Sequence, residues 1–403
     1  MPETRSRFAR RTAWDRAPSE LEQTSLAQQT GNAPLDLTSS NPTTCGFNLR
    51  PPEILDPLLH IGALSYTPSS KGLLSAREAV ATYYAEHGAS ISPGKIILTA
   101  STSEAYSHLF RLLCDPGDEV LIAQPGYPLF NYLADLSDVQ LRAYPLFYDH
   151  GWWIDRAELD RAVTPKTRAI IVVHPNNPTG HPTSAVERSH LHSLCLRHGL
   201  SLIVDEVFLD YPHPATPPIE SFATAPAPNL TFVLNGLSKV AALPQMKLGW
   251  ILTLGPDRDR EEASARLEII ADTFLSISTP AQLAAPAWLA NAPRAQKQIR
   301  DRIAQNLALL RRADFDLYEV AAGWSAILRL PAIFNTESAF ATLREAGILT
   351  HPAYFYGLDD PNRVVLSLIV PLDTMRQAID RILALQSPSG QFTAFVKEPD
   401  RAE

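Results

Sequence analysis

The stretch FVLNGLSKVAALPQMKLGW, residues 232–250, joins a strand-like apolar run to two lysines. The run Phe232 to Leu234 is typical of a strand that is covered on both faces. Lys239 follows it after only four residues, and the whole chain of 403 residues holds only seven lysines. A charged ammonium is costly to bury unless it is paired or neutral. Lys239 is therefore a candidate for a chemical role.

Outward from this stretch, short apolar runs alternate with helical patterns. Strands are predicted at KIILTA (95–100), EVLIA (119–123), RAIIVV (168–173), LSLIVDE (200–206), TFVLN (231–235) and GWILTL (249–254), and helices at 102–114, 128–136 and 184–199. Continuous apolar strands separated by helices favour a mostly parallel sheet that is covered on both faces. The predicted fold class is therefore α/β.

Polar or aromatic clusters follow five of these strands. They are STS (101–103), QPGYP (124–128), HPNNPTG (174–180), DEVF (205–208) and GLSK (236–239). In parallel sheets ligands bind beyond the carboxyl ends of the strands. The five clusters together therefore predict one site.

A second α+β segment is predicted toward the C-terminus. It consists of a polar helix (294–313), a strand (324–331), a helix (337–347), a strand (363–370) and a final helix (373–386). We expect an N-terminal arm (1–30), a large domain (60–285), a small domain (31–59 and 286–386) and a disordered tail (387–403).

Composition limits the class of protein. The formal net charge is −8, so no basic footprint for nucleic acid is visible. No apolar run approaches the roughly 20 residues of a membrane span, and no apolar segment follows the basic N-terminus as in a secretory signal. Cys45, Cys114 and Cys195 are far apart and lack metal-type spacing. We expect reduced thiols, no bound metal and a cytoplasmic protein.

A desolvated, partly neutral lysine is a nucleophile toward carbonyl groups and forms Schiff bases. This chemistry belongs to pyridoxal 5′-phosphate (PLP), whose sites need an acid at the pyridinium nitrogen and donors for the phosphate. Asp205, at a strand end, fits the acid. Thr102 and Ser103, which open a predicted helix, fit the phosphate. Tyr127 could stack on the ring, and Asn177 could donate to the phenolic oxygen.

The segments HPNNPTG, DEVF and SK, with the lysine eight residues before KLGW, resemble the fold-type I PLP-dependent aminotransferases of class I/II. The resemblance extends from LDLTSSNP (35–42) to the last helix. It implies a three-layer α/β/α large domain with a mostly parallel seven-stranded sheet and a small α+β domain. It further implies a homodimer with shared active sites, substrates that are amino and keto acids, and a cis Asn177-Pro178 bond.

The same resemblance implies roles for individual residues. Lys239 is implied as the Schiff-base lysine and acid/base, Asp205 as the pyridinium partner, Asn177 at the phenolic oxygen, Tyr127 in ring stacking, and Thr102 and Ser103 at the phosphate. Tyr66 matches the tyrosine that this family sends across the dimer interface to the partner's phosphate. Phe208, Ser238 and Lys247 are included among the cofactor-binding residues.

Three cofactor positions depart from the family pattern. Phe208 stands where the family usually has a tyrosine, so one hydroxyl to the phenolic oxygen is lost and the pKa of the Schiff base is expected to rise. Gly236 replaces a frequent serine, for which Ser238 could compensate. Lys247 replaces an arginine and keeps the charge without the bidentate fork.

A fourth departure concerns the substrate. The family clamps the substrate α-carboxylate with an arginine in a strand that corresponds to NRVVLSLIVP. One alignment puts Val365 at that position and loses the arginine. The other uses Arg363, two residues earlier on the same face of the strand. We favour the first alignment. Ser40, Asn177, Trp324, Tyr354 and Arg363 are the candidate substrate-binding residues.

Two other functions remain open. A different PLP reaction on the same scaffold, such as that of a decarboxylase, a C–S lyase or a cyclising enzyme, is the main alternative to amino transfer, because fold does not decide function. A non-catalytic PLP-binding regulator is the other. Such proteins usually carry an added DNA-binding domain, for which a 30-residue arm is too short.

Overall fold

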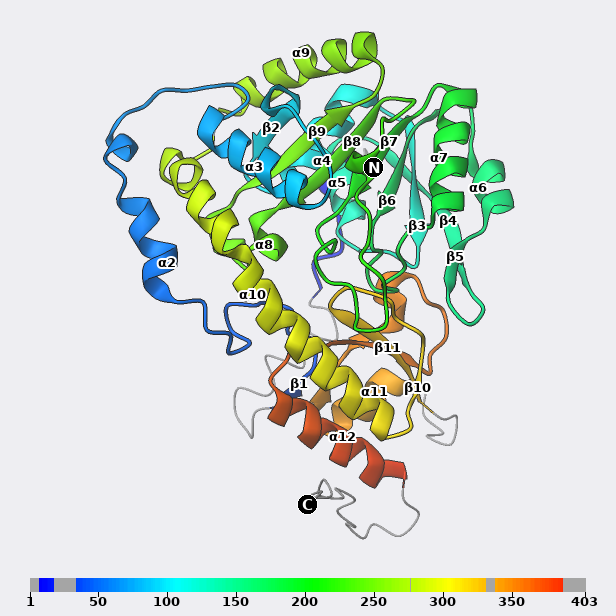
Figure 1. The fold of residues 1–403 in the computed structure, drawn as a ribbon. Coiled ribbons are helices and arrows are strands. Elements are labelled where there is room, and N and C mark those ends of the chain that lie inside the picture. Colours follow the sequence, from blue (N-terminus) through cyan, green and yellow to red (C-terminus); the bar gives the residue numbers. More distant parts are fainter. Residues whose placement is uncertain (1–6, 18–33, 276, 331–337, 387–403) are drawn as a thin grey trace.

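The computed structural model describes residues 7–17, 34–275, 277–330 and 338–386. Its central element is a sheet with the strand order β2-β9-β8-β7-β6-β3-β4-β5 (Figure 1). These strands are β2 (Ile96–Thr99), β3 (Glu119–Gln124), β4 (Gln140–Tyr148), β5 (Trp152–Ile154), β6 (Thr167–Val173), β7 (Ser201–Asp205), β8 (Thr231–Gly236) and β9 (Gly249–Leu254). The six strands predicted between residues 95 and 254 are all present in this sheet.

The sheet is mostly parallel, as predicted. The strands β8, β7, β6, β3 and β4 pair in parallel, whereas β2, β9 and β5 are joined antiparallel. The sheet has eight strands rather than the seven expected. Two of the eight, β4 and β5, were not predicted from the sequence pattern, and β5 pairs only with the end of β4, with Leu146 opposite Ile154. A strand of three residues is too short for its alternation to be recognised in the sequence.

Helices cover both faces of this sheet, which confirms the three-layer α/β/α architecture. Successive residues of β6 belong to different apolar clusters: Ile170 packs with one and Ile171 with the other. The first cluster includes side chains of α3 (Leu74–Glu86), α7 (Ala185–His198) and α10 (Thr279–Arg312). The second includes side chains of α4 (Thr102–Leu113), α5 (Phe130–Leu136) and α9 (Asp257–Thr273).

The long helix α10 connects the central sheet to the second sheet (Figure 1). It begins at Thr279, well before the predicted start at 294, and continues through Pro286 and Pro293. Prolines disfavour helix interiors, which is why the sequence predicted a later start. The helix persists because its early turns bury side chains such as Trp288 against the sheet. It runs through the expected boundary at 285/286, and the division into domains stays a prediction.

A second, antiparallel sheet lies below the first in Figure 1 and has the order β10-β11-β14-β13. It contains β10 (Asp316–Leu317), β11 (Ser325–Arg329), β13 (His351–Pro352) and β14 (Arg363–Ser367), and it packs with α11 (Ala339–Glu345) and α12 (Leu372–Gln386). A separate short pair joins β1 (Leu35–Asp36) to β12 (Ile348–Leu349). The predicted C-terminal α+β segment is thus confirmed.

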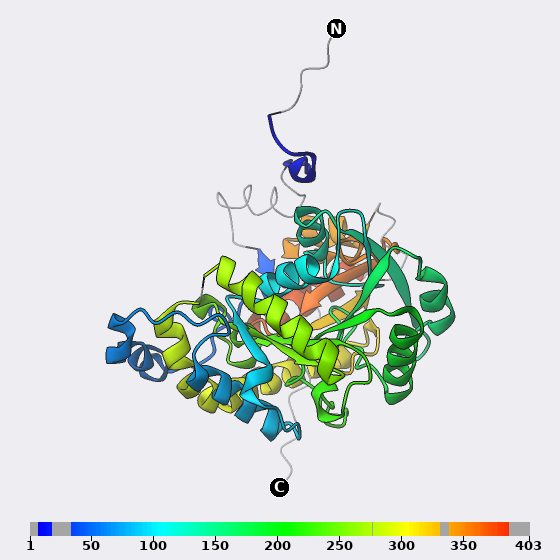
Figure 2. The same cartoon turned by 90° about the horizontal axis from the view of Figure 1, so that it is seen from above.

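The described part of the expected arm, residues 7–17, lies against α5. The Trp14 Nε1 atom donates to Asp135 at 2.8 Å, and the Trp14 ring packs edge-on against Tyr132. Figure 2 shows this segment, in dark blue, at one edge of the molecule. The rest of the arm and the predicted tail fall outside the described residues. No helix within the described ranges is long and apolar enough to cross a membrane.

Candidate functional site

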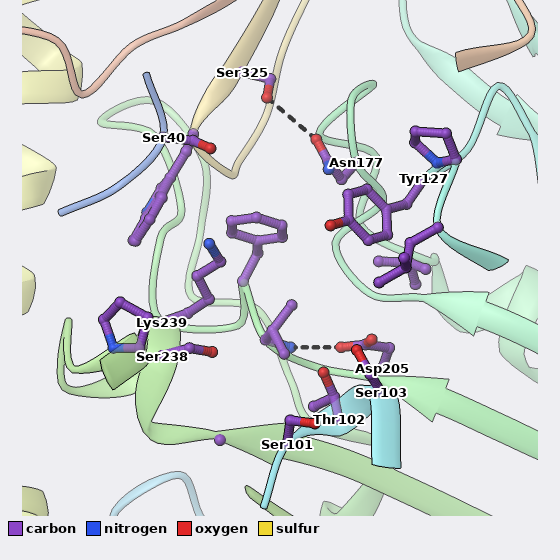
Figure 3. A pocket seen from close by; sticks show the side chains of 18 of the residues that line it. Ser40, Ser101, Thr102, Ser103, Tyr127, Asn177, Asp205, Ser238, Lys239 and Ser325 are labelled. Atoms are coloured by element: carbon purple, nitrogen blue, oxygen red, sulfur yellow. Dashed lines mark hydrogen bonds between the residues drawn. The ribbon is translucent and has the colours of Figure 1, made fainter. Parts of the chain in front are cut away.

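The five predicted strand-end clusters meet at one cavity of about 430 Å³. Each cluster contributes lining residues, which include Ser101, Thr102, Ser103, Tyr127, Asn177, Asp205, Phe208, Gly236, Ser238 and Lys239. Figure 3 shows Lys239, Asp205, Asn177 and Tyr127 around a common space. The convergence follows from the parallel sheet, whose strand ends β6, β7 and β8 lie side by side.

Lys239 reaches this cavity from α8 (Leu237–Val240), the single helical turn after β8. The Tyr211 hydroxyl donates to its backbone oxygen at 2.6 Å and so fixes the turn. Its Nζ lies 4.5 Å from the centre of the Trp324 ring and 5.7 Å from that of Phe208. Burial lowers the pKa of Lys239 to about 8, against the opposing charge of Asp205. Near neutral pH a fraction of this amine is unprotonated, as a nucleophile requires.

Asp205 ends β7 and is buried, with 6% of its surface exposed. Its carboxylate accepts hydrogen bonds from the Tyr106 hydroxyl at 3.0 Å and from the Val207 N–H at 3.1 Å. Burial raises the pKa of Asp205 to about 6, although both hydrogen bonds and Lys239 favour the charged form. Tyr106 was not foreseen, although it lies four residues after Thr102 and hence on the same face of α4.

The N-terminus of α4 forms another part of the wall. The Ser101 hydroxyl accepts from the Glu104 N–H at 3.1 Å and caps the helix. Thr102 and Ser103 present hydroxyls next to the free N–H groups of the first turn, and Lys247 lines the same cavity. Helix N-termini favour anions because their N–H groups are unpaired and the helix dipole is positive there. This end of the cavity suits a phosphate.

Asn177 lies in the loop after β6, in which the Asn177-Pro178 bond is cis as predicted. Its Oδ1 accepts a hydrogen bond from the Ser325 hydroxyl at 3.1 Å (Figure 3). Tyr127 also borders the cavity and contacts Phe130 edge-on, with ring centres 6.1 Å apart. Both residues lie where the sequence placed them.

The structure separates the candidate substrate-binding residues. Ser40 and Trp324 line the cavity. Arg363 lies outside it and lines a second pocket, where its Nε is 3.1 Å from Asp360 and its guanidinium lies 4.7 Å from the centre of the Tyr318 ring. Arg363 therefore does not border this cavity, and its contact with substrate stays a prediction. Its charge is already paired, and it sits at the far end of β14 from Ser367, which does line the cavity.

Two further candidates also lie away from the cavity lining. Tyr354 is 56% exposed and does not line it, whereas its neighbours Phe355 and Tyr356 do. A role for Tyr354 in substrate binding stays a prediction. Tyr66 is 70% exposed and outside the lining, so within one chain it does not reach the phosphate end.

Several lining residues were not predicted. Thr38, Ser101, Ser325, His351, Phe355, Tyr356 and Ser367 all contribute to the wall. Most come from segments far from the strand-end clusters in sequence. Ser101 had a visible signal, because it belongs to the predicted cluster STS and precedes the helix predicted at 102.

The donor set fits PLP. A half-buried lysine whose pKa is lowered shares the cavity with a buried carboxyl, and hydroxyls and a second lysine lie at the helix N-terminus. These are the lysine, the acid and the phosphate donors that this cofactor needs.

The family described as aminotransferase class I and II matches residues 34–382. The chain belongs to this family. Membership of this family agrees with the fit of the donor set to PLP.

Individual relatives and a solved structure are similar to this chain. The chain is 29% identical over 265 residues to glutamate-pyruvate aminotransferase AlaA of Escherichia coli (strain K12), a match that spans 65% of each protein. It is 29% identical over 353 residues to alanine aminotransferase of Mycobacterium tuberculosis (strain ATCC 25618 / H37Rv), which covers 84% of this chain and 76% of that protein. The structure of an alanine aminotransferase from Pyrococcus furiosus superposes with a TM-score of 0.84 at 21% identity, over 94% of this chain and 99% of that chain. The structural likeness supports the same fold.

Proposed function

We propose that this protein is a PLP-dependent aminotransferase that moves an amino group between an amino acid and a 2-oxo acid. The observation that carries the proposal is that a half-buried lysine, Lys239, and a buried carboxyl, Asp205, line one cavity together with a helix N-terminus. Membership of the family and its named relatives support the same activity.

The residues of the cavity divide into holding and proton-moving groups. Lys239 would attach the cofactor through its amine. The same amine, when free, would carry a proton between the substrate Cα and the C4′ carbon of the cofactor. Asp205 would hold a proton on the pyridine nitrogen. When bound, PLP supplies an electron sink for the carbon that bears the amino group. Trp324 and Phe208 shield the Lys239 amine from water on one side.

The remaining groups would orient the cofactor. Ser101, Thr102, Ser103, Ser238 and Lys247 would hold the phosphate, Tyr127 would stack on the ring, and Asn177 would donate to the phenolic oxygen. All seven residues line the cavity.

We also propose a homodimer with shared active sites. Leu59, Ile61 and Leu64 are each more than three-quarters exposed, and they lie in the segment that ends at Tyr66. Nearby Leu58, with Phe274 and Leu275, lines a further pocket that shares Ala100 and Lys247 with the main cavity. A second copy seated on this apolar face would cover it and bring its Tyr66 toward the phosphate end. A cytoplasmic location stays a prediction, which the three unpaired cysteines support.

The experiment that tests the function is spectroscopic. The purified protein is expected to show the visible absorbance of lysine-bound PLP, which borohydride fixes as a label on Lys239. Addition of single amino acids without a keto acid is expected to convert the cofactor to pyridoxamine phosphate, which chromatography measures. Lys239→Ala should lose the band and at least about 10²–10⁴-fold of activity.

The second candidate is another PLP reaction on the same fold. It is favoured by the placement of Arg363 outside the cavity and by Phe208, which carries no hydroxyl. The same experiment separates the two. Bound cofactor that no amino acid converts to pyridoxamine phosphate would contradict the aminotransferase and support a lyase or a decarboxylase.

A further inference from the structure

The hydrogen bond between Ser325 and Asn177 joins two distant parts of the chain at the cavity wall. Ser325 is the first residue of β11, and Asn177 lies in the loop after β6, 148 residues away in sequence. The Ser325 Oγ lies 3.1 Å from the Asn177 Oδ1, and both residues line the cavity (Figure 3). This is a direct side-chain link between the second sheet and a residue proposed to bind the cofactor.

The backbones on both sides are held without this bond. In the loop, the Asn176 N–H donates to His181 at 2.9 Å and the Gly180 N–H donates to Asn176 at 2.8 Å. In β11, Ser325 pairs with Ser367 across the sheet, and the Leu368 N–H donates to Trp324 at 2.7 Å. The bond between the two side chains therefore acts on the orientation of the Asn177 amide rather than on the course of either chain.

The orientation matters because the two ends of an amide are not equivalent. The Ser325 hydroxyl donates to Oδ1, so the Nδ2 group stays on the other side, toward the cavity (Figure 3). An ionised phenolic oxygen only accepts hydrogen bonds. A flipped amide would turn Oδ1 toward it and bring two acceptors together. Phe208 contributes no hydroxyl, so the phenolic oxygen depends more on Asn177 for a donor.

We propose that Ser325 is a positioning residue: it locks the Asn177 amide so that Nδ2 donates to the phenolic oxygen of the cofactor. The inference rests on the proposed attachment of PLP to Lys239. A donor at that oxygen stabilises its anionic form and so favours loss of the proton that the oxygen shares with the lysine-bound nitrogen. Ser325 thereby lowers the pKa of the lysine-bound cofactor.

The test is an absorbance titration of the holoenzyme between acid and alkaline pH. Ser325→Ala is expected to raise the pKa of the lysine-bound cofactor by about 0.5–1, the size that one net hydrogen bond allows. Ser325→Thr keeps the hydroxyl and should restore the wild-type pKa. Ser367→Ala is the matched control, because it removes a hydroxyl from the same wall that has no bond to Asn177. Ser367→Ala should leave the pKa of the lysine-bound cofactor unchanged.

A double-mutant cycle separates positioning from a general disturbance of the wall. Asn177→Ala should raise the pKa at least as far as Ser325→Ala, and the double variant should rise no further than Asn177→Ala alone. The other titratable groups that line the cavity, Tyr127, Asp205, Lys247, His351 and Tyr356, are the same in all four proteins.

Two results would overturn the inference. One is an unshifted pKa in Ser325→Ala. The other is an equal shift from Ser325→Ala whether or not Asn177 is present. If the wild type instead shows no borohydride-sensitive absorbance at all, the proposed function fails together with the inference. The two failures are thus distinguishable.

Discussion

At the scale of single residues, burial sets the chemistry of the site. Desolvation lowers the pKa of Lys239 to about 8 and raises that of Asp205 to about 6, because burial penalises the charged form of either group. The ammonium is costly there, and the cost makes the amine reactive.

The cost of burying the Asp205 carboxylate predicts how Asp205→Asn changes the free energy of unfolding of the apo-protein. Between about pH 4 and 6 the folded wild type keeps a proton on Asp205 that the unfolded chain has released, because the pKa is raised from 3.8 to about 6. Stability of the wild type therefore falls as the pH rises through this window. Asparagine has no carboxyl group that titrates in this pH range. Above about pH 6 we expect Asp205→Asn to gain up to about 3 kcal/mol in unfolding free energy.

Denaturant unfolding of both apo-proteins from about pH 4 to 8 measures this difference. Glu206, whose pKa burial raises to about 7, is common to both proteins and cancels. Adding PLP should reverse the order, because only the carboxylate pairs with a protonated ring nitrogen. A stability gap that does not change with pH would argue against a costly carboxylate at this position.

At the scale of elements, the pairing of β8 and β9 explains one departure from the family pattern. A Cβ atom at Gly236 would lie 3.1 Å from the Gly249 Cα and 3.1 Å from the Leu248 oxygen. Both are backbone atoms that have little room to move. The glycine where the family often has a serine therefore fits the close approach of these strands, and a hydroxyl for the phosphate must come from elsewhere, such as Ser238.

We therefore expect Gly236→Ser to destabilise the protein by about 1–3 kcal/mol through overpacking, without improving PLP affinity. Urea unfolding and a PLP titration measure the two effects. Gly94→Ser is the matched control. The nearest atom to a Cβ there is the Ser92 hydroxyl at 3.6 Å, an ordinary contact. An unchanged urea midpoint in Gly236→Ser, or tighter PLP binding, would contradict the prediction and show that β8 and β9 can move apart to accept the side chain.

At the scale of the whole molecule, the exposed apolar segment before Tyr66 predicts how the protein assembles. Replacing Ile61 and Leu64 together by aspartate should shift the protein toward monomer, because charged side chains would have to be buried between the copies. Cofactor retention should fall in parallel, since the partner's Tyr66 would no longer reach the phosphate. Sedimentation velocity and the absorbance of the bound cofactor measure both effects.

Val186→Asp provides the control for that assembly. Val186 is also an exposed apolar residue, but it lies on α7, at the opposite side of the molecule in Figure 1 from α2 (Pro51–Leu55) and the segment that follows it. It should leave both the sedimentation coefficient and the cofactor content as in the wild type. A double aspartate variant that remains dimeric and keeps its cofactor would refute this interface.

Much of the fold could be predicted because it depends on local patterns. The strands β6, β7 and β8 are continuous apolar runs, and the capping residue Ser184 and the terminal Gly199 mark the ends of α7. The prediction was wrong where tertiary packing overrides local preference, as in the first turns of α10 around Pro286 and Pro293. It was incomplete for β4, which was not predicted, and for β5, which has only three residues.

The residues of the candidate site likewise fall into those that could be predicted from the sequence and those that could not. The residues at the strand ends could be predicted from local patterns, because the topology of a parallel sheet brings the ends of neighbouring strands to one edge. Lys239, Asp205 and Asn177 could be named on that basis. The opposite wall, to which the second sheet contributes Ser325, Ser367 and His351, became visible only in the folded chain. The tertiary structure also decided that Arg363 faces Asp360 and Tyr318 instead. The physical reason is that side-chain contacts between distant segments depend on how the two sheets pack, which local periodicity does not encode.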